Sequence, residues 1–176
     1  MQYPGGLTVV RKVVAIGALT TALLAVGGIE PAQAASHPIF VWKSQRSGRC
    51  VDADLGTIGA NGTKVQLWSC NLSSQQNWVL YGDGTIRSSR SGQCLDADLN
   101  TIRANGTRVQ LWKCNGTMQQ KWTITGGSTG GSHQVLSRYS NRCVDADLNT
   151  IGTNGTKVQL WDCNGSLQQR WSTLYW

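Results

Sequence analysis

The sequence predicts an all-β protein made of three copies of one four-stranded unit. One pattern occurs three times in the same register: Cys-x-Asp-x-Asp, then Asn-Gly-Thr before Val-Gln-Leu-Trp-x-Cys, then Gln-x-Trp. The copies begin at Cys50, Cys94 and Cys143, and the two cysteines of each copy are 20 positions apart. No segment has the sustained 3.6-residue period of a helix. Because one such unit cannot bury its apolar face alone, we expect the three to close around a shared core.

Each copy contains four short runs rich in Val, Leu and Trp, separated by clusters of Gly, Asn, Ser and Thr, which is typical of strands and turns. The expected strands are 40–43, 49–52, 64–68 and 77–81, then 85–88, 93–96, 108–112 and 121–125, then 134–137, 142–145, 157–161 and 170–174. The Gly-rich segment 126–132 resembles an interdomain linker, but it takes the place of a short turn in the first copy. We therefore expect a lengthened hairpin loop there. The expected core consists of Val51, Leu67 and Trp78 with their copies.

Residues 1–34 are predicted to be an export signal. Arg11 and Lys12 precede an apolar run at 13–28, and Ala32-Gln33-Ala34 has the form of a cleavage site. A transmembrane anchor is the alternative, but the run is short and contains two threonines. Removal of these 34 residues from 176 leaves 142, enough for one domain at 35–176 with repeats at about 38–83, 84–132 and 133–176. We expect the mature protein to be secreted and extracellular.

The charge balance is basic, at +7 for the whole chain and +6 once Arg11, Lys12 and Glu30 are removed with the signal. Such a balance is compatible with nucleic acid or an anionic surface. The basic residues are scattered, however, with no run of five or more. The pattern favours a soluble basic surface, so we expect a monomer that neither binds nucleic acid nor inserts into a membrane.

Six cysteines in an exported chain predict disulfide bonds. Only bonds within each unit treat the three copies alike, which predicts Cys50–Cys70, Cys94–Cys114 and Cys143–Cys163. A metal site is disfavoured because no cysteine pair has two-residue spacing and the chain has only two histidines. Asp96-x-Asp98-x-Asn100 imitates the start of a calcium loop, but threonines stand at the Gly and Glu positions. We expect no cofactor and no bound metal.

These motifs resemble the ricin-type β-trefoil, the fold of the ricin B chain and of family 13 carbohydrate-binding modules, whose hallmark is the Gln-x-Trp repeat. The resemblance covers about residues 38–176. One Gln-x-Trp alone is weak evidence, whereas three with matching Cys-x-Asp and Gln-Leu-Trp-x-Cys segments are specific. The resemblance implies a β-trefoil with pseudo-threefold symmetry that binds carbohydrate.

The resemblance also implies which residues bind sugar. Asp52, Asp96 and Asp145 match the aspartate that binds sugar hydroxyls, and Trp68, Trp112 and Trp161 match the stacking aromatic. A sugar offers hydroxyls and apolar C–H faces, so a carboxylate beside a flat aromatic ring suits it. The alternatives are turn-capping aspartates and core tryptophans. We favour sugar contacts because Trp78 and its copies already supply the core set.

Amide side chains complete the predicted sites. Gln66, Gln110 and Gln159 border the family's pocket, although the same positions also suit ordinary exposed strand residues. Gln76, Gln120 and Gln169 belong to Gln-x-Trp, where a buried amide bonded to backbone is as plausible as a ligand contact. Before them stand Gln75, Gln119 and Gln168, where the family often has Asn. Asn71, Asn115 and Asn164 follow the second cysteine and are either pocket-rim or turn residues.

The sequence therefore predicts a non-catalytic lectin with three similar sites for galactose-type or xylan-type glycans. Glycosidases need two carboxylates in different environments, but Asp52 and Asp54 are alternate strand residues and the mature chain has no Glu. Neither histidine lies within a repeat motif, so no catalytic triad is evident. An accessory module of a glycoside hydrolase and a trefoil acting through protein contacts remain the alternatives.

Overall fold

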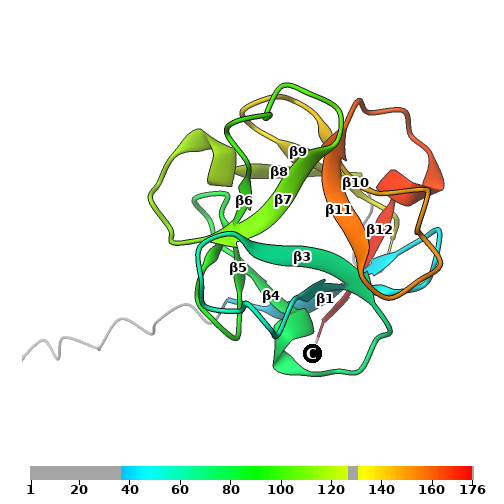
Figure 1. Ribbon diagram of the computed structural model, residues 1–176, viewed down its shortest axis with the longest axis horizontal. Coiled ribbons are helices and arrows are strands. Elements are labelled where there is room, and N and C mark those ends of the chain that lie inside the picture. Colours follow the sequence, from blue (N-terminus) through cyan, green and yellow to red (C-terminus); the bar gives the residue numbers. More distant parts are fainter. Residues whose placement is uncertain (1–36, 127–130, 176) are drawn as a thin grey trace, which may run out of the picture. The chain divides into compact units, whose positions relative to one another are not determined.

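The computed structural model describes residues 37–126 and 131–175. These residues contain twelve β-strands and three short 3₁₀ helices, in three similar groups (Figure 1). The first group contains β1 (Ile39–Ser44), β2 (Cys50–Ala53), β3 (Thr63–Trp68), η1 (Ser74–Gln76) and β4 (Asn77–Leu80). The second contains β5 (Ile86–Ser88), β6 (Cys94–Ala97), β7 (Thr107–Trp112), η2 (Met118–Gln120) and β8 (Trp122–Thr125). The third contains β9 (Gln134–Ser137), β10 (Cys143–Ala146), β11 (Thr156–Trp161), η3 (Leu167–Gln169) and β12 (Trp171–Tyr175).

Six strands, two from each repeat, form a closed barrel. β1 pairs with β12 and β4, β4 pairs with β5, and β8 pairs with β9, all antiparallel. The barrel closes where Trp122 N–H donates to the Gly84 carbonyl at 2.9 Å and where His133 and Trp171 exchange two bonds of 2.9 Å. Closure leaves none of these six strands with a free edge along its whole length.

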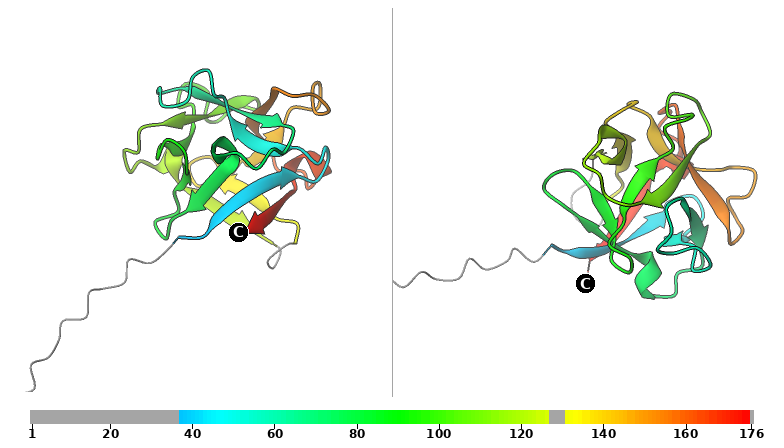
Figure 2. Two further views of the ribbon diagram at one scale, coloured as in Figure 1. Left: turned by 90° about the horizontal axis from the view of Figure 1, so that it is seen from below. Right: turned by 60° about the vertical axis from the view of Figure 1, so that its left-hand side comes forward.

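Three hairpins cover one end of the barrel, β2/β3, β6/β7 and β10/β11. The longer strands β3, β7 and β11 pair with one another at their ends and form a triangle around the pseudo-threefold axis (Figure 1). Figure 2 shows the hairpins and barrel from the side. Each contact uses an Asn-Gly turn: Gly62 N–H donates to the Leu111 carbonyl at 2.8 Å, and Gly62 has a φ of +87° that favours glycine. This arrangement of barrel and cap is the β-trefoil.

The core contains every residue set that the sequence analysis assigned to it. Val51, Leu67, Trp78 and their six copies are buried. The indole N–H groups of Trp78, Trp122 and Trp171 also donate to the backbone, as Trp78 does to the Val51 carbonyl at 3.1 Å. Trp42 was not anticipated; it is buried in the barrel, and its ring centroid lies 6.1 Å from that of Trp78.

The predicted strands are confirmed, each to within one residue at either end. The segment around 126–132 connects β8 to its hairpin partner β9, so it is a loop within the domain and not a linker; residues 127–130 of it lie outside the described part. The predicted export signal also lies outside the described residues and stays a prediction. Among the residues described, no helix is both long and apolar enough to span a membrane.

The three predicted disulfides are confirmed, with a Cα–Cα distance of 5.1 Å in each. Each joins the first strand of a cap hairpin to the segment that follows the second strand. We predict that Cys94→Ala/Cys114→Ala lowers the free energy of unfolding by about 3 kcal/mol, because a loop of this length gains that much entropy in the unfolded chain.

Urea unfolding of this double variant beside the parent measures the change. Non-reducing peptide mapping of the parent should give three bridges, each within one repeat. A bridge between repeats would contradict the assignment.

Candidate functional site

Each repeat places a carboxylate on the first strand of its cap hairpin. Asp52 on β2 lies opposite Gln66 on β3 in the strand register, and the Gln66 amide donates to Asp52 Oδ1 at 3.3 Å. The equivalent distances are 3.1 Å for Gln110 to Asp96 and 3.1 Å for Gln159 to Asp145. Both members of each pair are buried. The three aspartates are therefore held in the same orientation by the pairing of two strands.

The glutamine of each Gln-x-Trp motif holds the other carboxylate oxygen. Gln76 is fully buried, and its Nε2 donates to Asp52 Oδ2 at 3.0 Å and to the Ser69 carbonyl at 3.0 Å. Its Oε1 accepts from the backbone N–H of Asn71 at 2.9 Å. Gln120 and Gln169 make the same bonds. Of the two interpretations of these glutamines, the structure favours the buried amide: they position the aspartate and are not exposed to a ligand.

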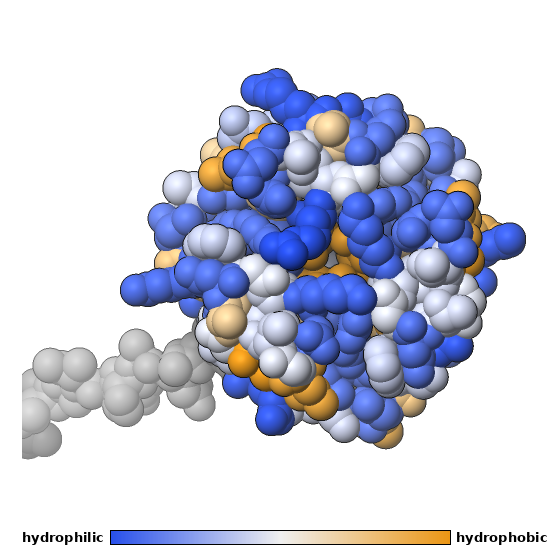
Figure 3. Space-filling view, in the orientation of Figure 1, coloured by the Kyte–Doolittle hydropathy of each residue, from blue (hydrophilic) through white to orange (hydrophobic). Residues whose placement is uncertain are grey.

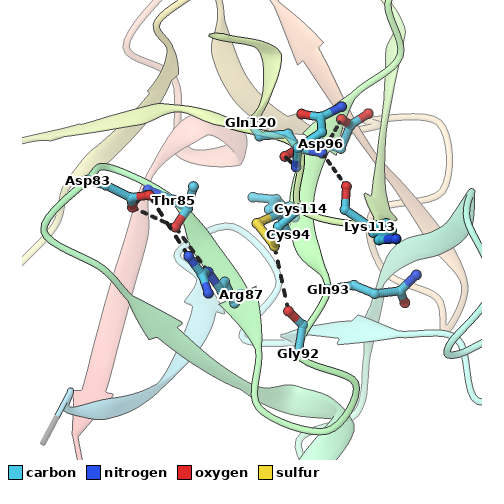
Figure 4. Close-up of a disulfide and its surroundings, with 12 residues drawn as sticks. Asp83, Thr85, Arg87, Gly92, Gln93, Cys94, Asp96, Lys113, Cys114 and Gln120 are labelled. Atoms are coloured by element: carbon cyan, nitrogen blue, oxygen red, sulfur yellow. Dashed lines mark hydrogen bonds and ion pairs between the residues drawn. A yellow bond between two sulfur atoms is a disulfide. The ribbon is translucent and has the colours of Figure 1, made fainter. Parts of the chain in front are cut away.

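Figure 4 shows this arrangement in the second repeat, where Gln120 and Asp96 lie together near the Cys94–Cys114 disulfide. The disulfide holds the first residue of β6, Cys94, against the segment that follows β7. Asp96 lies two residues further along β6. The disulfide thus holds the strand that carries the carboxylate, and two amides bond to the carboxylate itself.

The tryptophans of Gln-Leu-Trp differ from those of Gln-x-Trp in their exposure. Trp68, Trp112 and Trp161 are 38%, 38% and 39% exposed, whereas Trp78, Trp122 and Trp171 are buried. The first set ends the strands β3, β7 and β11 and faces solvent. The structure thus separates a core set from a surface set, as the sequence analysis expected, and a large exposed aromatic side chain is available to a ligand.

Cavities join the aspartate and the exposed tryptophan in two repeats. A hollow of about 300 Å³ in the second repeat contains Asp96, Gln110, Trp112, Asn115 and Gln119. One of about 520 Å³ in the third contains Asp145, Gln159, Trp161, Asn164 and Gln168. Both volumes suit a small ligand. The first repeat has the same burial and strand positions at the equivalent residues, which are Asp52, Gln66, Trp68, Asn71 and Gln75.

The cavities also contain residues that sequence reasoning missed. In the second repeat these are Asp98, Leu99, Asn100 and Arg108; in the third, Asp147, Leu148, Asn149 and Lys157. Strand alternation would direct the second aspartate to the opposite face, but β6 ends at Ala97, so alternation does not apply to Asp98. The repeated Asp-Leu-Asn run after the strand was the available signal. The first repeat has Gly56 in place of this asparagine.

A neighbouring repeat contributes to each site. Gly106, from the second repeat, borders the cavity of the third, and Lys157 Nζ donates to its carbonyl at 2.6 Å. In the same way Lys64 Nζ donates to the Gly155 carbonyl at 3.0 Å. A side chain at Gly62 would bring a Cβ within 3.2 Å of the Arg108 guanidinium, so glycine keeps this border open. Each site is complete only when the three repeats are closed together.

Burial raises the pKa of Asp52, Asp96 and Asp145 above the ordinary value of 3.8. Hydrogen bonds from the adjacent glutamines oppose this effect, and the charge of the second aspartate in each repeat adds to it. The three carboxylates therefore take up protons at a higher pH than an exposed aspartate. As hydrogen-bond acceptors for a ligand they are most effective when ionised.

Comparison with known proteins agrees with the geometry. The ricin-type β-trefoil lectin domain matches residues 40–171 of the chain. A comparison with curated protein sequences finds no match.

Among solved structures, a designed threefold-symmetric protein, ThreeFoil, is 22% identical with a TM-score of 0.70, covering 77% of this chain and 97% of its own. A ricin B-like lectin of Macrolepiota procera, in complex with lactose, is 21% identical with a TM-score of 0.66, covering 80% and 97%. An exo-β-1,3-galactanase from Clostridium thermocellum is 23% identical with a TM-score of 0.72, covering 81% of this chain but 31% of its own.

We predict that Trp122→Ala and Trp112→Ala differ sharply in stability, although both remove a tryptophan from the same repeat. Trp122→Ala should lower the free energy of unfolding by about 3–5 kcal/mol because it leaves a cavity in the core. Trp112→Ala should cost much less, since more than a third of its surface is already in water. Urea unfolding of both variants provides the measurement, and equal losses would contradict the division into core and surface tryptophans.

Proposed function

Because the chain belongs to the ricin-type β-trefoil lectin family, we propose that it is a secreted, non-catalytic carbohydrate-binding protein with three similar sugar sites. The observation that carries the proposal is the repeated pairing of a buried, amide-held aspartate with an exposed tryptophan across one cavity. A carboxylate with spare lone pairs accepts hydrogen bonds from vicinal hydroxyls, while the indole face packs against the C–H groups of the ring. The amides of Gln110 and Asn115, and their copies, are placed to assist.

Specificity for galactose-type or xylan-type glycans is part of the proposal. The lactose complex of a similarly folded lectin and the trefoil likeness within a galactanase support the galactose-type half. A hydrogen bond to a solvent-exposed sugar contributes only about 0.5–1.5 kcal/mol net. We therefore expect weak binding at a single site and stronger binding to a polymer, where linked sites raise avidity by about 10²–10⁴.

Strand alternation does not separate the two aspartates of the second repeat, because Asp96 and Asp98 share one cavity. Asp98 Oδ1 accepts from the Asn100 backbone N–H at 3.1 Å and from its side chain at 3.0 Å, as a turn-capping carboxylate does. The same pair recurs in the third repeat. Catalytic centres are normally single, whereas a binder gains from copies.

A galactoside resin or insoluble xylan should retain the purified protein, and no reducing sugar should be released. Sugar release that is abolished by Asp96→Ala would overturn the proposal.

We predict that Asp52→Ala, Asp96→Ala and Asp145→Ala each lower the calorimetric stoichiometry for a monosaccharide by about one site. The reason is that each carboxylate belongs to the site of its own repeat. Asp83→Ala is the matched control, because Asp83 is an aspartate that bonds to Lys121 and Thr85 outside the three sites. It should leave the stoichiometry unchanged.

Affinity for polysaccharide should fall more steeply in the double and triple variants, with circular dichroism reporting an intact fold. If the triple variant bound as well as the parent, the three-site proposal would be wrong. Binding of a protein in place of any glycan would favour the alternative of a trefoil acting through protein contacts.

We also predict that sugar affinity falls on acidification with a midpoint above the ordinary aspartate pKa of 3.8, because burial raises the pKa of the three site aspartates. For stability the sign is opposite: a raised folded-state pKa contributes stability below the unfolded pKa, and that contribution is lost as pH rises through the folded pKa. Protonation of these groups therefore reduces binding without unfolding the protein. Calorimetric titrations from neutral to acidic pH, with circular dichroism at each pH, measure both. Affinity that stayed constant across this range would contradict the role of the carboxylates.

A further inference from the structure

The three repeats meet at three equivalent junctions. At each one, an asparagine in the loop between the cap strands accepts a hydrogen bond from the backbone of the next repeat. Asn154 accepts from Ser69 N–H at 2.8 Å, Asn105 from Asp162 N–H at 2.7 Å, and Asn61 from Lys113 N–H at 2.7 Å. The backbone contact is thus common to all three junctions.

Two junctions are filled by an arginine that precedes the first cysteine of a repeat. Arg49 donates from Nε and Nη2 to the Gly152 carbonyl at 3.1 and 2.7 Å, and from Nη1 to Asn154 and Ser69. Arg142 donates in the same way to the Arg103 carbonyl at 3.0 and 2.7 Å. Its Nη1 bonds to Asn105 and Asp162. A guanidinium therefore bridges the loop and the neighbouring repeat in both places.

The third junction has Gln93 in place of the arginine. A cavity of about 620 Å³ lies there, bordered by Gly59, Asn61, Arg87, Gln93 and Lys113. Gln93 is only 9% exposed, yet its side-chain Oε1 has no hydrogen-bond partner among the described residues. Figure 4 shows Gln93 and Lys113 near the Cys94–Cys114 disulfide. A buried amide oxygen without a partner is costly, so a ligand that donates to it is favoured.

The charges around this cavity are positive. No carboxylate borders it, and Lys113, which stands where the other repeats have Ser69 and Asp162, forms no salt bridge among the described residues. Arg87 is 3.9 Å from Asp83, so part of its charge is compensated. The face of the molecule drawn in Figure 3 is mostly hydrophilic, with apolar residues in separate patches. The cavity thus combines an uncompensated ammonium group, an acceptor without a partner and polar walls.

We propose that this junction is a fourth ligand site, distinct from the three aspartate–tryptophan cavities, and that it binds an acidic sugar. The carboxylate or sulfate of the sugar pairs with Lys113, and a ring hydroxyl donates to Gln93 Oε1. The inference that the ligand is a sugar rests on the proposed function. The inference that it carries an anionic group and a hydrogen-bond donor follows from the residues of the cavity. Charge-assisted hydrogen bonds are about twice as strong as neutral ones and are weakened by salt.

The test is titration of ¹⁵N-labelled protein with galacturonic acid, galactose 6-sulfate and galactose, followed by NMR. The acidic sugars should shift the side-chain amide of Gln93 and the backbone amides of Asn61 and Lys113, and galactose should shift them at least tenfold more weakly. Comparison of the two acids identifies whether carboxylate or sulfate is preferred. No shift with either acid, or equal shifts with galactose, would overturn the proposal.

Matched variants follow from the other junctions. Gln93→Arg/Lys113→Ser copies the Arg49 and Ser69 pair of the first repeat into this junction and should weaken binding of the acidic sugars at least tenfold. Lys113→Gln removes the charge without filling the cavity and should also weaken it. The shifts of Asn61 and Lys113 should persist in Asp145→Ala, which alters a proposed sugar site of the third repeat and no residue that borders this cavity, so failure of this site is separated from failure of the proposed sugar sites.

The reverse exchange tests whether these two positions are sufficient. Arg49→Gln/Ser69→Lys should create a second acidic-sugar site at the first junction and raise the number of acidic-sugar sites by one. Unchanged acidic-sugar binding by Gln93→Arg/Lys113→Ser would show that the ligand binds elsewhere.

Discussion

The buried amide of each Gln-x-Trp glutamine is the interaction on which the rest of the site depends. Gln76 connects the carboxylate on β2 to two backbone groups of the segment after β3, and Trp78, two residues later, lies in the barrel core. Removal of this amide would deprive the buried Asp52 Oδ2 and two partly buried backbone groups of this partner. A buried polar group left unpaired costs about 1–3 kcal/mol. The motif therefore ties the geometry of the aspartate to the packing of the core.

Repetition and divergence have different physical origins in this fold. Residues that close the barrel and cap, such as Gly62 and Trp78, face the same constraint in every repeat because each neighbour is a copy of the others. Positions at the junction surfaces are less constrained. Gln93 replaces an arginine there, and Gly56 replaces an asparagine at the border of the first aspartate site. The three aspartate sites thus share the aspartate and the amides that bond to it, and they differ in the residues at their borders.

Much of the candidate site was predictable because its residues recur at fixed spacing. Asp96, Gln110, Trp112, Asn115 and Gln119 were all identified from the repeats and share one cavity. Gln120 was left between two interpretations, since spacing does not show whether an amide faces a ligand or the interior. Asp54 was expected to point away from Asp52, but its copy Asp98 shares a cavity with Asp96, because β6 ends at Ala97 and strand alternation does not extend to Asp98.

By itself, the sequence determined the class of fold, the strands, the disulfide pairing and the two sets of tryptophans. These properties are local or repeated, so they can be predicted from the periodicity of the chain and the symmetry of its repeats. Only the tertiary structure decided which repeat completes which site. Gly106 and Lys157 lie 51 positions apart and meet because β7 and β11 pair around the axis. The cavity at Gln93 is likewise formed by two repeats, so no pattern within one of them predicts it.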